Sequence, residues 1–291
     1  MAATLALVAA LFFAAGTVLL QKGTLETKSK ASDPRFFVQI FRRPVWLLGG
    51  ALTIVGGLCQ MAALSRGPIT VVQPIILLSL VFALPLGKWL TDQQVGRREA
   101  ISAAIVIVAL IAFLSISSPS GGVKNPSSNR WLVSAALVGV TVAVTARSSR
   151  GRSPAAIAVL LGTAAGLAFG FEAAVMKLFT SLLSGGIPAI LTNWSTYVLI
   201  LSALAGGALQ QASLKAGVLA PSMASVNVAN LVASVLMGAL VFDERLATGS
   251  GALFFSLLAL AATAAGVVLL TMWRTPAPVG DTPPPPAAAH P

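Results

Sequence analysis

The chain has few charged residues and almost none of the side chains on which enzyme sites depend. Only 9% of its 291 residues are Asp, Glu, Lys or Arg, whereas a soluble domain carries about a quarter. Its single histidine, His290, is the penultimate residue, so the body of the chain has no histidine for a catalytic triad, a proton shuttle or a metal site. We therefore expect neither an enzyme nor a bound cofactor.

A single cysteine and scattered basic residues exclude two further classes of protein. Cys59 is the only cysteine, so the chain is not a disulfide scaffold. The formal net charge is +11, but a nucleic-acid surface needs its basic residues gathered on one exposed face. Here they stand in short segments between hydrophobic runs, so we expect no nucleic-acid partner.

Long hydrophobic runs make up most of the chain, which is 56% apolar with a mean hydropathy of +0.89. A helix needs about 17 to 25 apolar residues to cross a hydrocarbon core of about 30 Å, and it satisfies its own backbone in lipid. Runs of about this length occur at 2–21, 45–64, 69–89, 100–117, 131–146, 155–182, 190–211, 218–242 and 251–273. We predict an all-α, polytopic membrane protein of nine helices in a lipid bilayer, the fifth helix being the shortest.

The basic residues between consecutive runs are distributed unevenly over the two sides of the membrane. Fourteen lie on one side: Lys22, Lys28, Lys30, Arg35, Arg42, Arg43, Lys88, Arg97, Arg98, Arg147, Arg150, Arg152, Lys215 and Arg274. Four lie on the other side: Arg66, Lys124, Arg130 and Arg245. Because cytoplasmic loops carry the excess of Lys and Arg, we expect a cell-membrane protein with its N-terminus outside and its C-terminus in the cytoplasm.

Two parts of the sequence resemble each other at an offset of 150 residues. The matched residues are Gly56 and Gly206, Gly57 and Gly207, Gln60 and Gln210, Leu64 and Leu214, Gly67 and Gly217, and, at an offset of 151, Asp92 and Asp243. The first four runs thus repeat as the last four, and the single run between them inverts the second copy, as in many secondary transporters. We expect a first four-helix repeat at 1–117, a linker and fifth helix at 118–154, a second repeat at 155–273, and a disordered Pro/Ala-rich tail at 274–291.

Three motifs relate the chain to a known family. They are Lys22 after the first run, PITVVQP at 68–74, and FDERL at 242–246 after the eighth run. With these motifs the chain resembles, over about residues 4–272, the drug/metabolite transporter superfamily of EamA-like proteins, and most closely its nine-helix branch of NIPA-like magnesium transporters. The resemblance implies alternating access, with magnesium as a candidate cargo.

Charged residues within the runs are the first candidates for function, because a charge in lipid is costly unless it faces the bundle interior. Glu172 is the only acidic residue within a predicted span, and therefore the only intramembrane acidic candidate for a metal ligand or a proton carrier. A tie between helices is the alternative role. Lys177 lies nearer the end of the same run, either in the substrate pathway or extended to the lipid headgroups.

Uncharged polar residues form a second set of candidates. Met223, Asn227, Asn230 and Ser234 are spaced by four, three and four, which places them along one stripe of a helix. The stripe faces either another helix or the solute. Further candidates for the substrate pathway are Gln60, Gln73 and Gln210.

Small residues and prolines suggest where helices pack closely or unwind. Gly162, Gly166 and Gly170 have the spacing that lets a second helix approach. The candidates for local unwinding are Pro74, Pro85 and Pro221.

These observations predict a secondary transporter that moves a small solute or cation by alternating access, with Mg²⁺ as one candidate. A proton-coupled exporter of a metabolite or drug is the alternative within this class. A non-transporting membrane scaffold is the alternative of another class, and a homodimer is left open.

Overall fold

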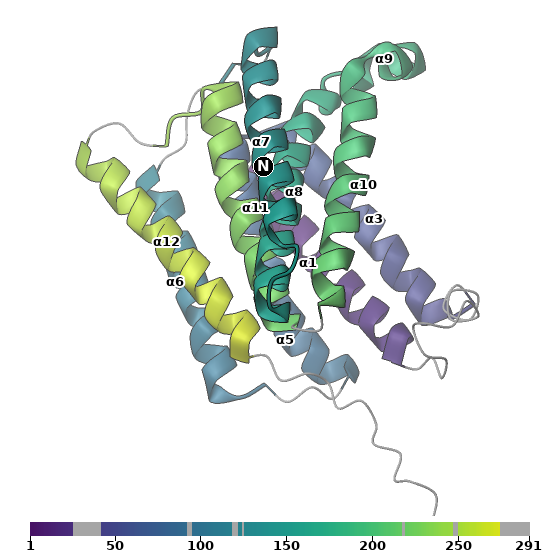
Figure 1. Cartoon of the computed structure of the whole chain (residues 1–291), viewed down its shortest axis with the longest axis vertical. Helices are drawn as coiled ribbons and strands as arrows, with labels where there is room; N and C mark the ends of the chain where they lie inside the picture. The colour runs from purple at the N-terminus through teal and green to yellow at the C-terminus, as the bar shows by residue number, and fades with distance from the viewer. Residues whose placement is uncertain are drawn as a thin grey trace, which may run out of the picture.

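The computed structural model of the chain describes residues 1–25, 42–91, 95–117, 122–123, 125–216, 219–246 and 250–273. Within these residues every long element is a helix, and nine helical segments are long and apolar enough to cross a membrane. The prediction of an all-α polytopic membrane protein is therefore confirmed (Figure 1). The match at Asp92 and the predicted tail at 274–291 lie outside the described residues.

The first four spans are formed by five helices. These are α1 (Ala2–Leu25), α3 (Pro44–Leu64), α4 (Ile69–Ile76) followed by α5 (Leu78–Thr91), and α6 (Arg97–Ser117).

The third span, predicted over 69–89, is interrupted at one residue, Leu77, between α4 and α5, and the Leu77 backbone stays in the right-handed helical region. Pro74 lies inside α4, where it has no N–H to donate to Thr70 and its ring crowds that carbonyl. The chain therefore has a one-residue interruption three residues after Pro74 but no unwound stretch there. Pro85 stands inside α5 without an interruption, and Pro221 lies in the first turn of α11, close to residues outside the described ranges.

The remaining spans follow in order. They are α7 (Ser128–Ser148), α8 (Pro154–Thr180), α10 (Trp194–Lys215), α11 (Leu219–Phe242) and α12 (Ser250–Trp273), with a short helix α9 (Gly186–Thr192) between α8 and α10. The fifth span, α7, is confirmed and has 21 residues.

The seventh span was predicted to begin at Ile190, which is wrong. Ile190 belongs to α9, and the backbone is extended at Asn193. The Asn193 side chain accepts a hydrogen bond from the backbone N–H of Ser195 (2.9 Å). An asparagine at this position caps a new helix, so α10 begins at Trp194.

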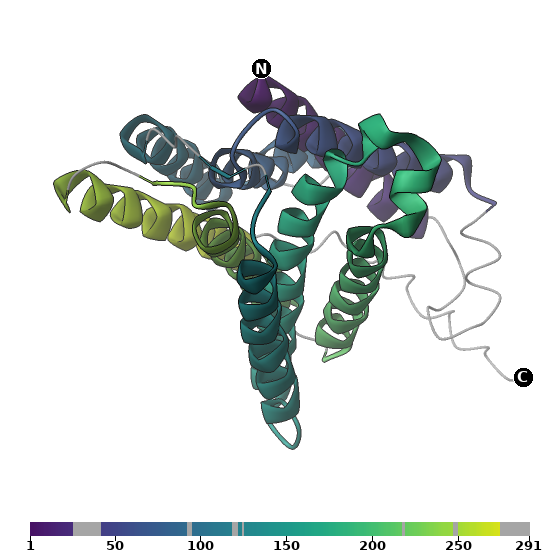
Figure 2. The same ribbon diagram turned by 90° about the horizontal axis from the view of Figure 1, so that it is seen from above.

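The helices pack in two groups. In one, α1 packs along α3 and along α4 and α5; in the other, α8 packs along α10 and α11. The pair α6 and α12 stands to one side, and α7 lies at the edge of the bundle against α8 and α11 (Figures 1 and 2).

Glycines of α8 let α11 approach closely, as predicted. A Cβ on Gly166 would lie 2.8 Å from the backbone nitrogen of Asn230, and one on Gly170 would lie 2.9 Å from that of Ser234. Gly162 faces the same helix at Ser222. The predicted packing role of this stripe is confirmed.

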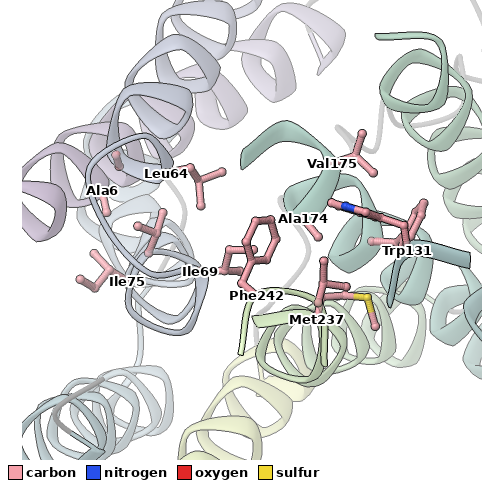
Figure 3. Close-up of a cluster of buried hydrophobic side chains, with 13 residues drawn as sticks. Ala6, Leu64, Ile69, Ile75, Trp131, Ala174, Val175, Met237 and Phe242 are labelled. Carbon is pink, nitrogen blue, oxygen red and sulfur yellow. The ribbon is translucent and has the colours of Figure 1, made fainter. Parts of the chain in front are cut away.

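The main hydrophobic core lies at one end of the bundle, which we call the Met1 end. It brings together Ala6 of α1, Leu64 of α3, Ile69 of α4, Phe242 of α11 and Trp131 of α7 (Figure 3). The Trp131 ring contacts three other aromatic rings edge to face, with centroids 5.3 to 6.2 Å apart. The helices of both groups are therefore packed together at the Met1 end.

Candidate functional site

A buried ion pair lies at the Met1 end, beside the ends of α8 and α11. Glu244 follows α11, and its side chain is fully buried, while that of Lys177 is 19% exposed. Lys177 Nζ lies 2.6 Å from Glu244 Oε1 and 4.7 Å from the centre of the Phe242 ring. A carboxylate and an aromatic face both attract the ammonium group. Lys177 is therefore held by Glu244, and its extension to the lipid headgroups is not what the structure shows.

The same carboxylate caps the N-terminus of α4. Glu244 Oε1 accepts a hydrogen bond from the backbone N–H of Ile69 (2.9 Å), and Oε2 accepts one from the N–H of Thr70 (3.0 Å) and one from its hydroxyl (2.9 Å). A negative charge is favoured at a helix N-terminus, where backbone donors have no partner within the helix. Glu244, Lys177, Ile69 and Thr70 form what we call the Glu244 cluster.

The backbone after α11 turns sharply to bury Glu244. Asp243 adopts a φ of 57°, in the left-handed region that Asp tolerates better than most residues. The Glu244 N–H donates to the carbonyl of Gly238 (3.0 Å). A Cβ on Gly238 would lie 2.6 Å from Glu244 Oε2, so only glycine leaves room for the carboxylate.

Gln73 is a buried polar side chain on the face of α4 that meets α11. Thr70 lies against Gly238, and Leu77 packs in a cluster with Leu231. Gln73 is three residues after Thr70 and four before Leu77, hence on the same face of the helical segment, opposite the stretch of α11 between Leu231 and Gly238. It is 3% exposed, and its amide nitrogen has no hydrogen-bond partner among the described residues.

The predicted polar stripe of α11 lies on that helix's interior face. Asn230 and Ser234 precede Met237 by seven and three residues, which places all three on one face, and Met237 belongs to the main core. Part of the stripe bonds within the helix: Asn227 Nδ2 donates to the carbonyl of Met223 (2.7 Å), and the Ser234 hydroxyl donates to Asn230 Oδ1 (3.2 Å). The Asn230 amide group has donors to spare, so it can bind a further acceptor.

Glu172 lies on α8, eight residues before the last residue, Thr180. At 1.5 Å per residue this is about 12 Å from the Met1 end of that helix. Its side chain is partly buried. Among the described residues, no hydrogen bond or ion pair involves its carboxylate. The structure thus shows no polar tie from Glu172 to another helix.

The two matched glutamines lie at opposite ends of the bundle. Gln60 stands four residues before the end of α3, near the Met1 end, whereas Gln210 stands five residues before the end of α10, near the other end. Both are partly buried. The structure therefore does not bring them together with each other.

Sequence reasoning missed Glu244 and Thr70, the residues with the most hydrogen bonds in this region. Glu244 lies outside the predicted spans, because it follows a hydrophobic run. The motif FDERL, which carries the family resemblance and contains Glu244, is the signal that could have found it. In the described part of the chain, no group of three or more His, Cys, Asp or Glu residues is placed to hold a metal ion.

The chain is similar to an uncharacterized protein of Corynebacterium glutamicum. The two are 32% identical over 253 residues, which cover 84% of this chain and 86% of the relative. No protein-family model matches the chain, and no solved structure matches it.

Proposed function

We propose that this chain, which belongs to the same family as the Corynebacterium glutamicum protein, is a secondary transporter of a small polar solute or cation. Its two halves, α1 to α6 and α8 to α12, act as inverted repeats that expose an interior site to one side of the membrane at a time. The proposal assigns no catalytic step to the protein.

The observation that carries the proposal is a contact that recurs in both halves. A Cβ on Gly56 of α3 would lie 2.9 Å from the Phe13 ring of α1, and a Cβ on Gly206 of α10 would lie 2.7 Å from the Phe169 ring of α8. Gly56 and Gly206 are matched by the sequence offset of 150. Each of the matched glycines thus packs against a phenylalanine ring of the first helix of its own half, which favours a structural repeat over a chance likeness of apolar helices.

The pairing of the helices supports the same arrangement. The first helix of each half packs on the second and the third, as α1 does on α3, α4 and α5, and α8 does on α10 and α11. Between the halves, third helices meet as α4 and α11, and fourth helices meet as α6 and α12. A two-fold axis between two halves brings equivalent helices together in this way. A non-transporting scaffold has no need of such a two-sided design.

The seam between the halves holds the groups that would bind a solute. Gln73 comes from the first half and Asn230 and Ser234 come from the second, and amide donors suit a solute with oxygen acceptors. Glu172 is the acidic candidate for a cation or a proton. Hydrated Mg²⁺ needs only one or two carboxylates, so it belongs among the solutes to be tested. The basic-residue count supports an orientation in which the Met1 end faces outside.

Flux measurements on purified protein in liposomes test the proposal. We expect saturable flux of one member of a panel of divalent cations, metabolites and drugs, absent from liposomes without protein. Gln73→Leu should reduce that flux several-fold, whereas Gln211→Leu, at an exposed position of α10, should leave it unchanged. Equal flux through the two variants would remove Gln73 from the pathway, and no protein-dependent flux across the panel would contradict the function.

A further inference from the structure

The Glu244 cluster joins the two proposed halves at the Met1 end. Glu244 and Lys177 belong to the second half, and Ile69 and Thr70 belong to the first. The three hydrogen bonds from Ile69 and Thr70 to the Glu244 carboxylate therefore cross from one half to the other. They are the charged contact between the halves at the Met1 end.

The third span also packs against the second half. Its Met1-end portion, α4, lies against α8 and α11. Its other portion, α5, packs along α1, and its Val81 and Leu84 share a buried cluster with Leu231 of α11 and Leu270 of α12. At the Met1 end, the contact of α4 with the second half adjoins the Glu244 cluster, because Ile69 and Thr70 are the first residues of α4.

We propose that the Glu244 cluster is the latch that holds the Met1 end of the transporter closed. Opening this end requires α4 to leave α8 and α11, and the capping bonds to Glu244 must break as it leaves. Lys177 stays with Glu244 in the opened state, because both lie in the second half. Lys177 therefore keeps the buried carboxylate paired both when the N-terminus of α4 is bound to Glu244 and when it has moved away. The role of a latch rests on the proposed transport function, whereas the hydrogen bonds between α4 and Glu244 do not depend on it.

The test follows the exposure of a buried reporter in full-length protein in lipid nanodiscs. Val72 of α4 is fully buried in the main core, so Val72→Cys, in a Cys59→Ala background, reacts with a polar maleimide only when the seam opens. The reporter is combined with Thr70→Val, which removes the hydroxyl bond to Glu244 and keeps the shape. A bond to a charged group is worth about a tenfold change in an equilibrium. We expect the labelling rate to rise by about that factor.

Two matched variants serve as controls. Thr70→Ser keeps the hydroxyl and should label as slowly as the parent. Thr263→Val makes the same change at a buried threonine whose hydroxyl bonds only within α12, to the Ala259 carbonyl (2.9 Å), and it should also label slowly. Glu244→Gln, which removes the charge, should label faster than Thr70→Val. If it fails to fold, Thr70→Val decides alone.

Equal labelling in Thr70→Val and Thr263→Val would overturn the latch. The labelling needs no transported solute, so the two proposals fail separately. Faster labelling of Thr70→Val without any flux supports the latch and contradicts transport. Flux together with unchanged labelling of Thr70→Val supports transport and contradicts the latch.

Discussion

At the scale of single residues, the polar contacts of Glu244 and Glu172 are the reverse of what their positions in the sequence suggest. Glu244 stands beyond a hydrophobic run yet is fully buried, with four polar contacts. Glu172 stands inside a run yet has no polar partner among the described residues. The position of Glu172 within a span could be predicted from hydropathy. The burial of Glu244 could not, because it depends on a left-handed Asp243 and on a helix start 175 residues away along the chain.

The ion pair predicts a large loss of stability when one partner is removed. Lys177→Met leaves the Glu244 carboxylate buried without its cation, at a cost of about 3 to 5 kcal/mol. Thermal unfolding of the purified protein should show a marked fall in Tm, and Lys177→Met/Glu244→Gln should recover part of it, since no buried charge then remains. Lys215→Met, at an exposed position, is the control. A Tm for Lys177→Met equal to that of the control would show that the pair contributes nothing.

Glu172 is predicted to act through its charge. Glu172→Gln keeps the size of the side chain and removes the titratable group, so the protein should fold and insert while flux falls at least tenfold or loses its dependence on pH. Flux through the native protein and the variant is to be measured between pH 5 and pH 8. Unaltered flux at every pH would assign Glu172 a structural role and leave Asn227 and Asn230 as the candidates.

At the scale of helices, hydropathy and length predicted the nine spans, because a helix in lipid must be long and apolar. Breaks inside spans were harder to predict. Pro74 lies three residues before the interruption at Leu77, Pro85 stands in an uninterrupted helix, and the start of α10 depends on a single capping side chain at Asn193. Both features depend on local hydrogen bonds and packing, which an average over an apolar window does not record.

The contact between α8 and α11 predicts different outcomes for the same substitution in two helices. Gly166→Ala places a methyl group against the backbone of α11, and overpacking of this kind costs about 1 to 3 kcal/mol. Gly207→Ala, in α10, meets open space and should be neutral or slightly stabilising, because alanine favours the helix. Thermal unfolding in one detergent compares the two. Equal Tm values would mean that α8 and α11 are not in close contact.

At the scale of the whole molecule, the two ends of the bundle differ in their number of basic residues, and this bias predicts which end faces the cytoplasm. The helix α7 offers an exposed serine at each end, Ser127 and Ser148, about 30 Å apart. In a Cys59→Ala background, Ser127→Cys should react with a membrane-impermeant maleimide on intact cells. Ser148→Cys should react only after permeabilisation. The reverse pattern would invert the proposed orientation, and with it the side to which the Glu244 cluster belongs.

The most direct test of the central claim is solute counterflow in liposomes that contain the purified protein. The liposomes are loaded with an unlabelled solute identified by the flux panel, and the same solute is added outside in labelled form at low concentration. A transporter with alternating access returns labelled solute inward as unlabelled solute leaves, so the label should accumulate transiently above its outside concentration. Entry of the label that only approaches equilibrium would indicate a channel, and no protein-dependent entry would contradict transport altogether.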